Sequence, residues 1–183
     1  MTAGRGRDPG ELWTIGHGNS SEPEFLRRLL DHGIELLVDV RALPGSRRSP
    51  QFDADRMPQW LDGIDYLRSP ELGGRRARQD VDPEINAGWR NASFKNYADH
   101  TLTEPYQRGL ERLRASATDR RTAVMCGEPV PWRCHRLLIA TSLVARGWTV
   151  WHLIGDGRPH RHELGEWGAE PSVAEDGTVT YPA

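Results

Sequence analysis

Short apolar runs that alternate with helical patterns constrain the fold of this chain more than any other feature. Strand-like runs stand at residues 12–15, 36–40, 64–67, 122–126 and 149–154. The stretches at 21–30 and 137–145 have the apolar spacing of helices. A strand without polar alternation is typical of a sheet covered on both faces. The order therefore predicts an α/β fold with a mainly parallel central sheet of about five strands and helices on both faces.

The length of 183 residues suits a single domain. We expect a flexible N-terminus at 1–10, the α/β domain at 11–165 and a partly irregular C-terminal tail at 166–183. Residues 70–90 lack apolar periodicity and predict a long loop, of the kind that is often functional. The pattern indicates no second domain, and it does not indicate an oligomeric state.

Composition excludes several classes of function. No run of 18 apolar residues and no hydrophobic signal core occur, so we expect a cytoplasmic protein that does not bind a membrane. Two cysteines make no disulfide framework, although a regulatory disulfide between them stays open. The formal net charge of −2 gives no global attraction to nucleic acid, so any such binding would rest on local arginine clusters.

Polar residues gather where the predicted strands end. Ligands of parallel sheets bind beyond the carboxyl ends of the strands, where loops and helix N-termini converge. One cleft should therefore collect these side chains. The candidates from the first three strands and their loops are His17, Asn19, Asp39, Arg41, Arg47, Glu71, Gly73 and Gly74.

The segment from Cys126 to Arg136 links a buried strand to a strong helix and is the most informative motif. Cys134, His135 and Arg136 should occupy or precede the first helical turn, where free N–H groups and the helix dipole favour an anion. Arg133 and Arg136 can add bidentate contacts to that anion. A phosphate or carboxylate is the expected guest.

The same field would lower a thiol pKa, so Cys126 or Cys134 is a candidate nucleophile, with His135 or His17 as the proton carrier. Cysteine phosphatases place an arginine six positions after the cysteine, whereas Arg133 lies seven after Cys126 and two prolines intervene. Cys126 as a small buried apolar residue is the alternative. The cysteines are eight positions apart, which does not match structural zinc sites, and we expect neither metal nor cofactor.

The carboxylates have two interpretations. Asp39 interrupts an apolar strand and is either a structural ion pair with Arg41 or a general base, and Glu71 is a second candidate for proton transfer. His17 and Asn19 either orient the substrate or fix the turn through bonds to the backbone.

In order along the chain, several motifs resemble those of the bacterial domain of unknown function 488 family. They are Thr14–Asn19, Leu37–Arg41, Pro44–Arg47, Glu71–Gly74 and Cys126–Arg136, within a stretch from Leu12 to Leu164. The resemblance implies a compact α/β fold with a cleft formed by these motifs. One departure is Gly18, where the family more often has serine, which removes one hydroxyl from the cleft.

These patterns lead to three hypotheses. The first is a hydrolase of a phosphate-bearing substrate, nucleotide or nucleic acid, with N-glycosidic cleavage preferred and Asp39 or Glu71 handling protons. The second is a thiol-dependent enzyme or redox sensor that uses Cys126 and Cys134. The third is a non-catalytic module that binds nucleic acid or nucleotide through the arginine loops.

Overall fold

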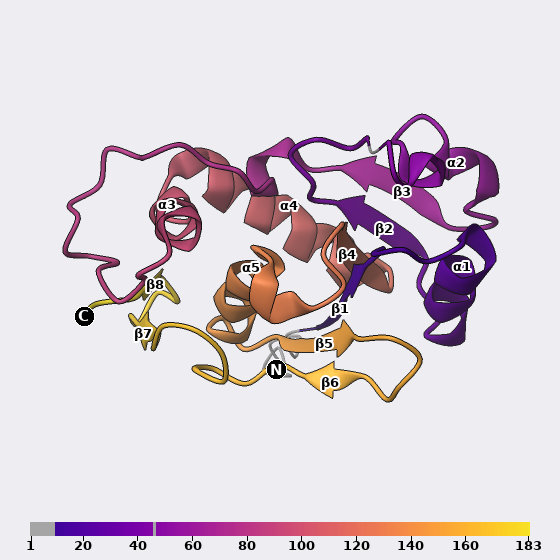
Figure 1. The fold of residues 1–183 in the computed structure, drawn as a ribbon. Helices are drawn as coiled ribbons and strands as arrows, with labels where there is room; N and C mark the ends of the chain where they lie inside the picture. The colour runs from indigo at the N-terminus through magenta and orange to yellow at the C-terminus, as the bar shows by residue number, and fades with distance from the viewer. Residues whose placement is uncertain (1–9, 46) are drawn as a thin grey trace, which may run out of the picture.

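The computed structural model describes residues 10–45 and 47–183. At its centre is a six-stranded sheet of order β3-β2-β4-β1-β5-β6, in which β1 to β5 are parallel and β6 is antiparallel (Figure 1). The strands are β1 (Glu11–Gly16), β2 (Leu36–Asp39), β3 (Asp65–Arg68), β4 (Thr122–Cys126), β5 (Thr149–Leu153) and β6 (His160–Arg161). The predicted α/β fold with a mainly parallel sheet is confirmed.

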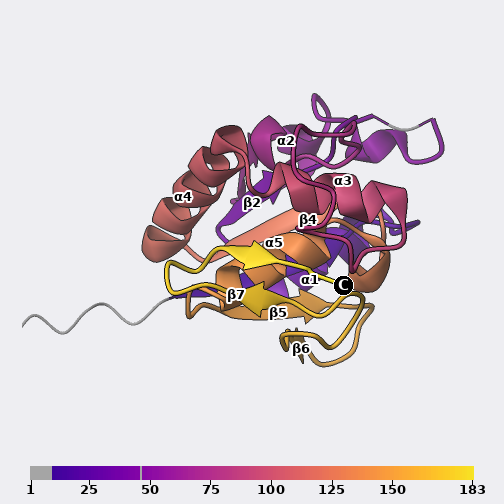
Figure 2. The same cartoon turned by 90° about the vertical axis from the view of Figure 1, so that its left-hand side faces the viewer.

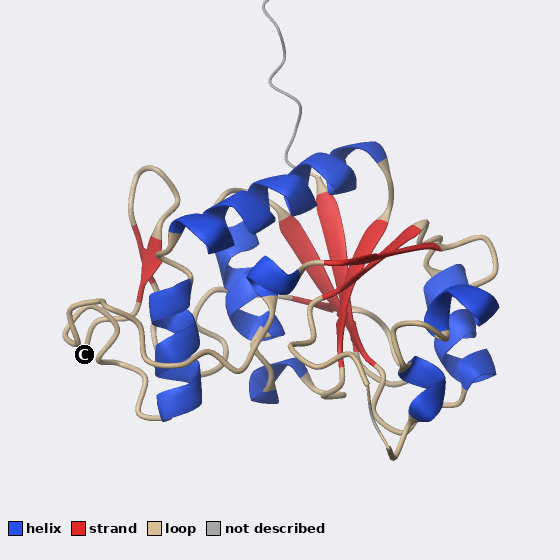
Figure 3. Cartoon of the chain, turned by 90° about the horizontal axis from the view of Figure 1, so that it is seen from above, coloured by secondary structure: helices blue, strands red, loops and turns tan. Residues whose placement is uncertain are grey.

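Helices cover both faces of the sheet. Seen from above, α1 and α2 lie on one side of the strands and α3, α4 and α5 on the other (Figure 3). Their bounds are α1 (Glu22–Asp31), α2 (Met57–Trp60), α3 (Ala92–His100), α4 (Glu104–Asp119) and α5 (Arg136–Val144). Among the described residues, no helix combines the length and the apolar character that crossing a membrane requires.

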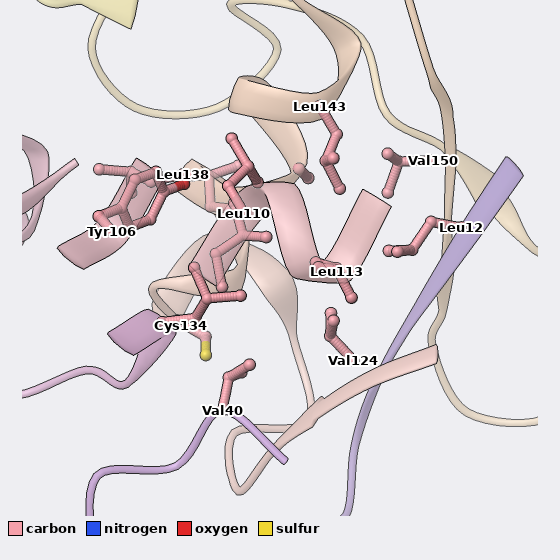
Figure 4. Packing of buried hydrophobic residues seen from close by; sticks show 14 of the residues in the cluster. Leu12, Val40, Tyr106, Leu110, Leu113, Val124, Cys134, Leu138, Leu143 and Val150 are labelled. Atoms are coloured by element: carbon pink, nitrogen blue, oxygen red, sulfur yellow. The ribbon is translucent and has the colours of Figure 1, made fainter. Parts of the chain in front are cut away.

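The central strands β1, β2 and β4 send alternate side chains into two separate cores, because successive residues of a strand point to opposite faces. Leu12 and Val124 join the α3–α5 side, whereas Trp13 and Met125 join the α1–α2 side. Figure 4 shows the first core, in which Cys134 lies near Val40 among leucines of α4 and α5. Both cysteines of the candidate site, Cys126 and Cys134, thus belong to this core.

The start of α1 follows from local sequence. The Ser21 hydroxyl accepts from the Glu24 backbone N–H, and the Glu24 carboxylate accepts from the Ser21 N–H, which is the predicted capping box. Gly33, with a φ of 65°, ends the helix where an L side chain would be strained.

The C-terminal residues contain more structure than an irregular tail. β6 extends the sheet beside β5, and β7 (Ser172–Val173) pairs with β8 (Val179–Thr180) in a hairpin that Figure 2 shows near the C-terminus. Val179 and Tyr181 are buried in the α3–α5 core. Residues 1–9 of the predicted flexible N-terminus lie outside the described residues.

The carboxyl ends of β1, β4 and β2 form one level edge. Gly16 is paired with Cys126 and Asp39 with Met125, and the backbone N–H groups of the next residues continue these ladders. The loop after β4 folds back across β1 so closely that a Cβ on Gly16 would lie 1.8 Å from the Glu128 carbonyl oxygen. A glycine at position 16 is therefore needed to seat this loop over the edge.

We predict that Gly16→Ala lowers the free energy of unfolding by about 1–3 kcal/mol, because the methyl group forces the 127–130 loop off β1. Urea unfolding of the variant and the wild type measures this loss. Gly157→Ala is the control, since a Cβ there meets its first neighbour at 3.9 Å. Equal unfolding midpoints for all three proteins would contradict the prediction.

Candidate active site

A cleft of about 510 Å³ opens at the carboxyl edge of the sheet. Loops that follow β1, β2 and β4 meet α3 and the start of α5 around it. Of the residues predicted from sequence, the cleft wall contains His17, Arg41, Gly74, Cys126, Arg133, Cys134 and His135. Segments that are far apart in the chain therefore do converge here.

The two thiols lie together at the base of this cleft. Cys126 and Cys134 are 3% and 6% exposed, and the Cys126 thiol donates to the Glu128 carbonyl oxygen at 3.7 Å. Burial raises the pKa of Cys126 well above its usual value. Burial acts on Cys134 in the same direction, but the neighbouring Cys126 side chain, together with His135 and the Arg136 charge, brings the pKa of Cys134 well below its usual value. Cys134 is thus the more acidic thiol of the pair.

His135 is oriented as a proton partner for Cys134. Its Nε2 lies 2.7 Å from the Val40 carbonyl oxygen, which only accepts, so Nε2 carries a hydrogen. In the neutral ring Nδ1 then has a lone pair, and it lies 3.5 Å from the Cys134 sulfur. Transfer of the thiol proton to Nδ1 produces a thiolate and an imidazolium, as in other activated cysteine sites.

Gly74 makes room for this imidazole. A Cβ at position 74 would lie 2.7 Å from His135 Nδ1 and 3.0 Å from Cε1. Tyr97 supports the same ring, with centroids 5.0 Å apart. The predicted glycine therefore acts on the site through the position of His135, since only a residue without a side chain leaves that space.

Arg136 brings a positive charge into the core beside the sulfurs. It is fully buried, and its guanidinium donates to Thr14 Oγ1 at 3.2 Å and to the Glu128 carbonyl at 2.6 Å. No carboxylate forms an ion pair with it in the described part of the chain. Although burial opposes ionisation, the neighbouring thiols raise the pKa of Arg136. The Arg136 charge in turn helps to lower the pKa of Cys134.

Asp39 and Arg41 form a closed ion pair rather than an open base. Asp39 Oδ1 accepts from the Arg41 backbone and Nε at 3.0 Å, and Oδ2 accepts from Nη2 at 2.7 Å and from the Tyr66 hydroxyl. Arg41 also donates to the Phe52 carbonyl at 2.6 Å. Of the two interpretations of Asp39, the geometry matches the structural ion pair.

His17 offers a neutral nitrogen to the cleft. Its Nδ1 donates to the Gly18 carbonyl at 2.9 Å, so Nε2 holds a lone pair and lies 3.5 Å from Arg41 Nη1. Burial, reinforced by the Arg41 charge, lowers the pKa of His17. The ring also stacks on Phe52 at 4.4 Å. A fixed neutral imidazole can accept a proton from water or substrate.

The remaining predicted residues lie elsewhere. The Glu71 carboxylate accepts from Arg112 on α4 at 2.7 Å, away from the cleft wall. Asn19 is exposed and lines a neighbouring hollow that shares His17 with the cleft. Gly73 ends the short 3-10 turn at Pro70–Leu72, and Arg47 is exposed on its loop. None of these four residues belongs to the described wall of the cleft.

Sequence reasoning missed several residues of the wall. Glu128 is the only carboxylate among the described lining residues, and Arg75, Phe94 and Tyr97 come from the long loop and α3. Arg75 has a φ of 57°, which is rare for a residue with a side chain. Glu128 lies inside the Cys126–Arg136 motif, so its position there was the available signal. Within the described residues, no cluster of three or more histidine, cysteine or acidic side chains could hold a metal.

The fold and the cleft together define a parallel α/β protein with a cysteine, histidine and arginine site at the carboxyl edge of its sheet. The family model described as domain of unknown function DUF488 matches residues 22–143, which is more than half of the chain. The chain belongs to this family, as the resemblance predicted. Neither the curated proteins nor the solved structures yielded a match.

We predict that Cys134 is alkylated by iodoacetamide at a rate that stays constant as the pH falls well below about 8.5, the ordinary thiol value. The rate falls only when the pH passes the lowered pKa of Cys134, because the thiolate is the reacting form. Mass spectrometry of the alkylated peptide across pH measures this profile.

Cys126→Ser retains a hydrogen-bond donor and should keep most of the profile, whereas Cys126→Ala removes the donor and should slow the reaction at neutral pH. Labelling of wild-type Cys134 that follows an ordinary thiol titration would be the contrary result.

Proposed function

We propose that this protein is a thiol-dependent enzyme in which Cys134 acts as a nucleophile on a phosphate-bearing substrate. One observation carries the proposal: the Cys134 sulfur faces Nδ1 of an imidazole whose other nitrogen is fixed on the Val40 carbonyl. A nucleophile, a base and a group that orients the base are the parts that covalent catalysis needs. The buried Arg136 supports it, because its charge favours the thiolate.

The charge of the cleft supports an anionic substrate. Arg75 and Arg133 are exposed at its wall, and Glu128 is the one described carboxylate there. Arginine binds phosphate through paired N–H groups, and α5 begins directly after Cys134 and His135. A phosphate-bearing small molecule or nucleotide fits these groups, in agreement with the expectation from the sequence.

The reaction would proceed in two steps. The Cys134 thiolate attacks the electrophilic centre of the substrate and forms a sulfur–substrate bond, while the bond to the leaving group breaks and His135 Nδ1–H protonates that group. In the second step water attacks the intermediate, and the neutral Nε2 of His17 accepts its proton. The sulfur–substrate bond then breaks and the thiolate is restored, while His17 releases its proton to solvent and His135 Nδ1 takes one up.

A carboxylate mechanism is the competing candidate, and Glu128 is the observation that keeps it. N-glycosidic hydrolysis needs an acid that faces the substrate. Asp39 is occupied by Arg41 and Tyr66, and Glu71 by Arg112. Glu128 lines the cleft. This reaction, and a purely binding role, remain predictions that the experiments below separate.

We predict that iodoacetate alkylates Cys134 faster than iodoacetamide does, reversing their order toward free cysteine, because the arginines attract the anion. Inorganic phosphate should slow the reaction in competition with iodoacetate. Arg133→Gln should lower the preference several-fold, whereas the exposed Arg158→Gln, outside the cleft, serves as the matched control. If phosphate gives no protection and the free-cysteine order persists, the cleft does not select anions.

We also predict that Cys134→Ser abolishes turnover of nucleoside monophosphates or chromogenic phosphate esters, whereas Glu128→Gln retains it. Loss of activity by at least a hundredfold is expected, since the nucleophile takes part directly. The reverse pattern, with Glu128→Gln inactive and Cys134→Ser active, would support the carboxylate mechanism. Tight binding of these compounds without turnover in the wild type would indicate a binding module.

A further inference from the structure

A second buried polar cluster contacts Arg136 through Thr14. Thr14 of β1, His152 of β5, His162 just after β6 and Thr141 of α5 are each 5% exposed or less. Their side chains form a continuous chain of hydrogen bonds. The lengths are 2.6 Å from Thr14 Oγ1 to His152 Nδ1, 3.0 Å from His152 Nε2 to His162 Nδ1, and 3.0 Å from His162 Nε2 to Thr141 Oγ1.

The Arg136 end of this chain allows one continuous direction of donation. A guanidinium only donates, so Thr14 Oγ1 accepts from Arg136, and the hydroxyl hydrogen can then point to His152 Nδ1. In that arrangement His152 Nδ1 accepts, the hydrogen of the neutral ring is on Nε2, and His152 donates to His162 Nδ1.

The opposite end fixes this direction. The Thr141 hydroxyl donates to the Leu137 carbonyl at 3.0 Å, because a carbonyl oxygen has no hydrogen to give. Thr141 Oγ1 must then accept from His162 Nε2–H, which leaves Nδ1 of the neutral His162 ring to accept from His152 Nε2–H. Hydrogen therefore lies on Nε2 of each neutral histidine, and every bond points from Arg136 toward Leu137.

Burial keeps both rings neutral, as this direction requires. Burial, with the nearby charges of His162 and Arg136, lowers the pKa of His152 to about 2. Burial lowers the pKa of His162 to about 4, although Glu166 opposes that shift. An imidazolium in either position would place two donors against each other and interrupt the chain.

We propose that His152 and His162 are positioning residues that hold the Arg136 guanidinium against the Cys126–Cys134 pair. The chain presents the acceptor side of Thr14 to Arg136 and anchors its far end in the first turn of α5, the helix that begins with Arg136. A neutral acceptor fixes the cation without cancelling its charge, whereas a carboxylate would compete with the thiolate for it. This inference rests on the proposed function of Cys134.

The experiment interrupts the chain without touching the cleft. Thr14→Val removes the hydroxyl at nearly constant volume, and His152→Leu and His162→Leu break the two middle bonds. We expect the midpoint of the Cys134 alkylation profile to move up by about one pH unit in each variant, which is a tenfold loss of rate at pH values below the thiol pKa. Thr14→Ser should restore the wild-type rate profile, and His160→Leu is the control, because His160 pairs with Glu166 outside the chain.

Wild-type profiles in folded chain-breaking variants would overturn the proposal. A second measurement does not depend on how the variants fold: nitrogen NMR of the wild-type imidazoles at neutral pH should show both rings neutral with hydrogen on Nε2. Hydrogen on Nδ1 of either ring, or an imidazolium, would also overturn it. If wild-type Cys134 titrates as an ordinary thiol, the proposed function fails, and the ring tautomers still report on the chain by themselves.

Discussion

The buried guanidinium of Arg136 is the constraint on which the site depends. A cation removed from water is costly unless nearby groups supply negative potential. Here the suppliers are the Thr14 hydroxyl, the Glu128 carbonyl and the two thiols, with no carboxylate ion pair in the described chain. A negative charge on Cys134 would stabilise the buried cation further. The Arg136 charge lowers the pKa of Cys134, and the thiols raise the pKa of Arg136, so each group favours the charged form of the other.

Arg41, the other buried arginine near this edge, is held by a carboxylate instead. Arg41 is held by Asp39 through several bonds, and Tyr66 completes the coordination of the carboxylate. Asp39 largely neutralises the charge of Arg41, and Arg41 fixes the loop after β2 near the cleft through its bond to the Phe52 carbonyl. Arg41 after β2 and Arg136 at the start of α5 therefore differ, because Arg41 has a carboxylate partner and Arg136 has none among the described residues.

Much of the site follows from local pattern. The strand-to-helix position of the Cys126–Arg136 motif and the strand-end location of His17 and Asp39 can be predicted from residue order. Residue order does not predict which carboxylate faces the cleft. Glu71 lies close to the predicted edge in sequence, yet its side chain turns to Arg112 on α4, while Glu128 remains on the wall. That choice depends on contacts between segments distant in the chain.

Sequence by itself determined the alternation of strands and helices and the mainly parallel sheet, because periodicity and capping act over a few residues. Only the tertiary structure decided which thiol has the lowered pKa and what surrounds Arg136. Thr14 and His152 are 138 positions apart, and their hydrogen bond arises from the pairing of β1 with β5. No local pattern encodes such a contact, since strand order sets the neighbours of a buried side chain and thereby its charge.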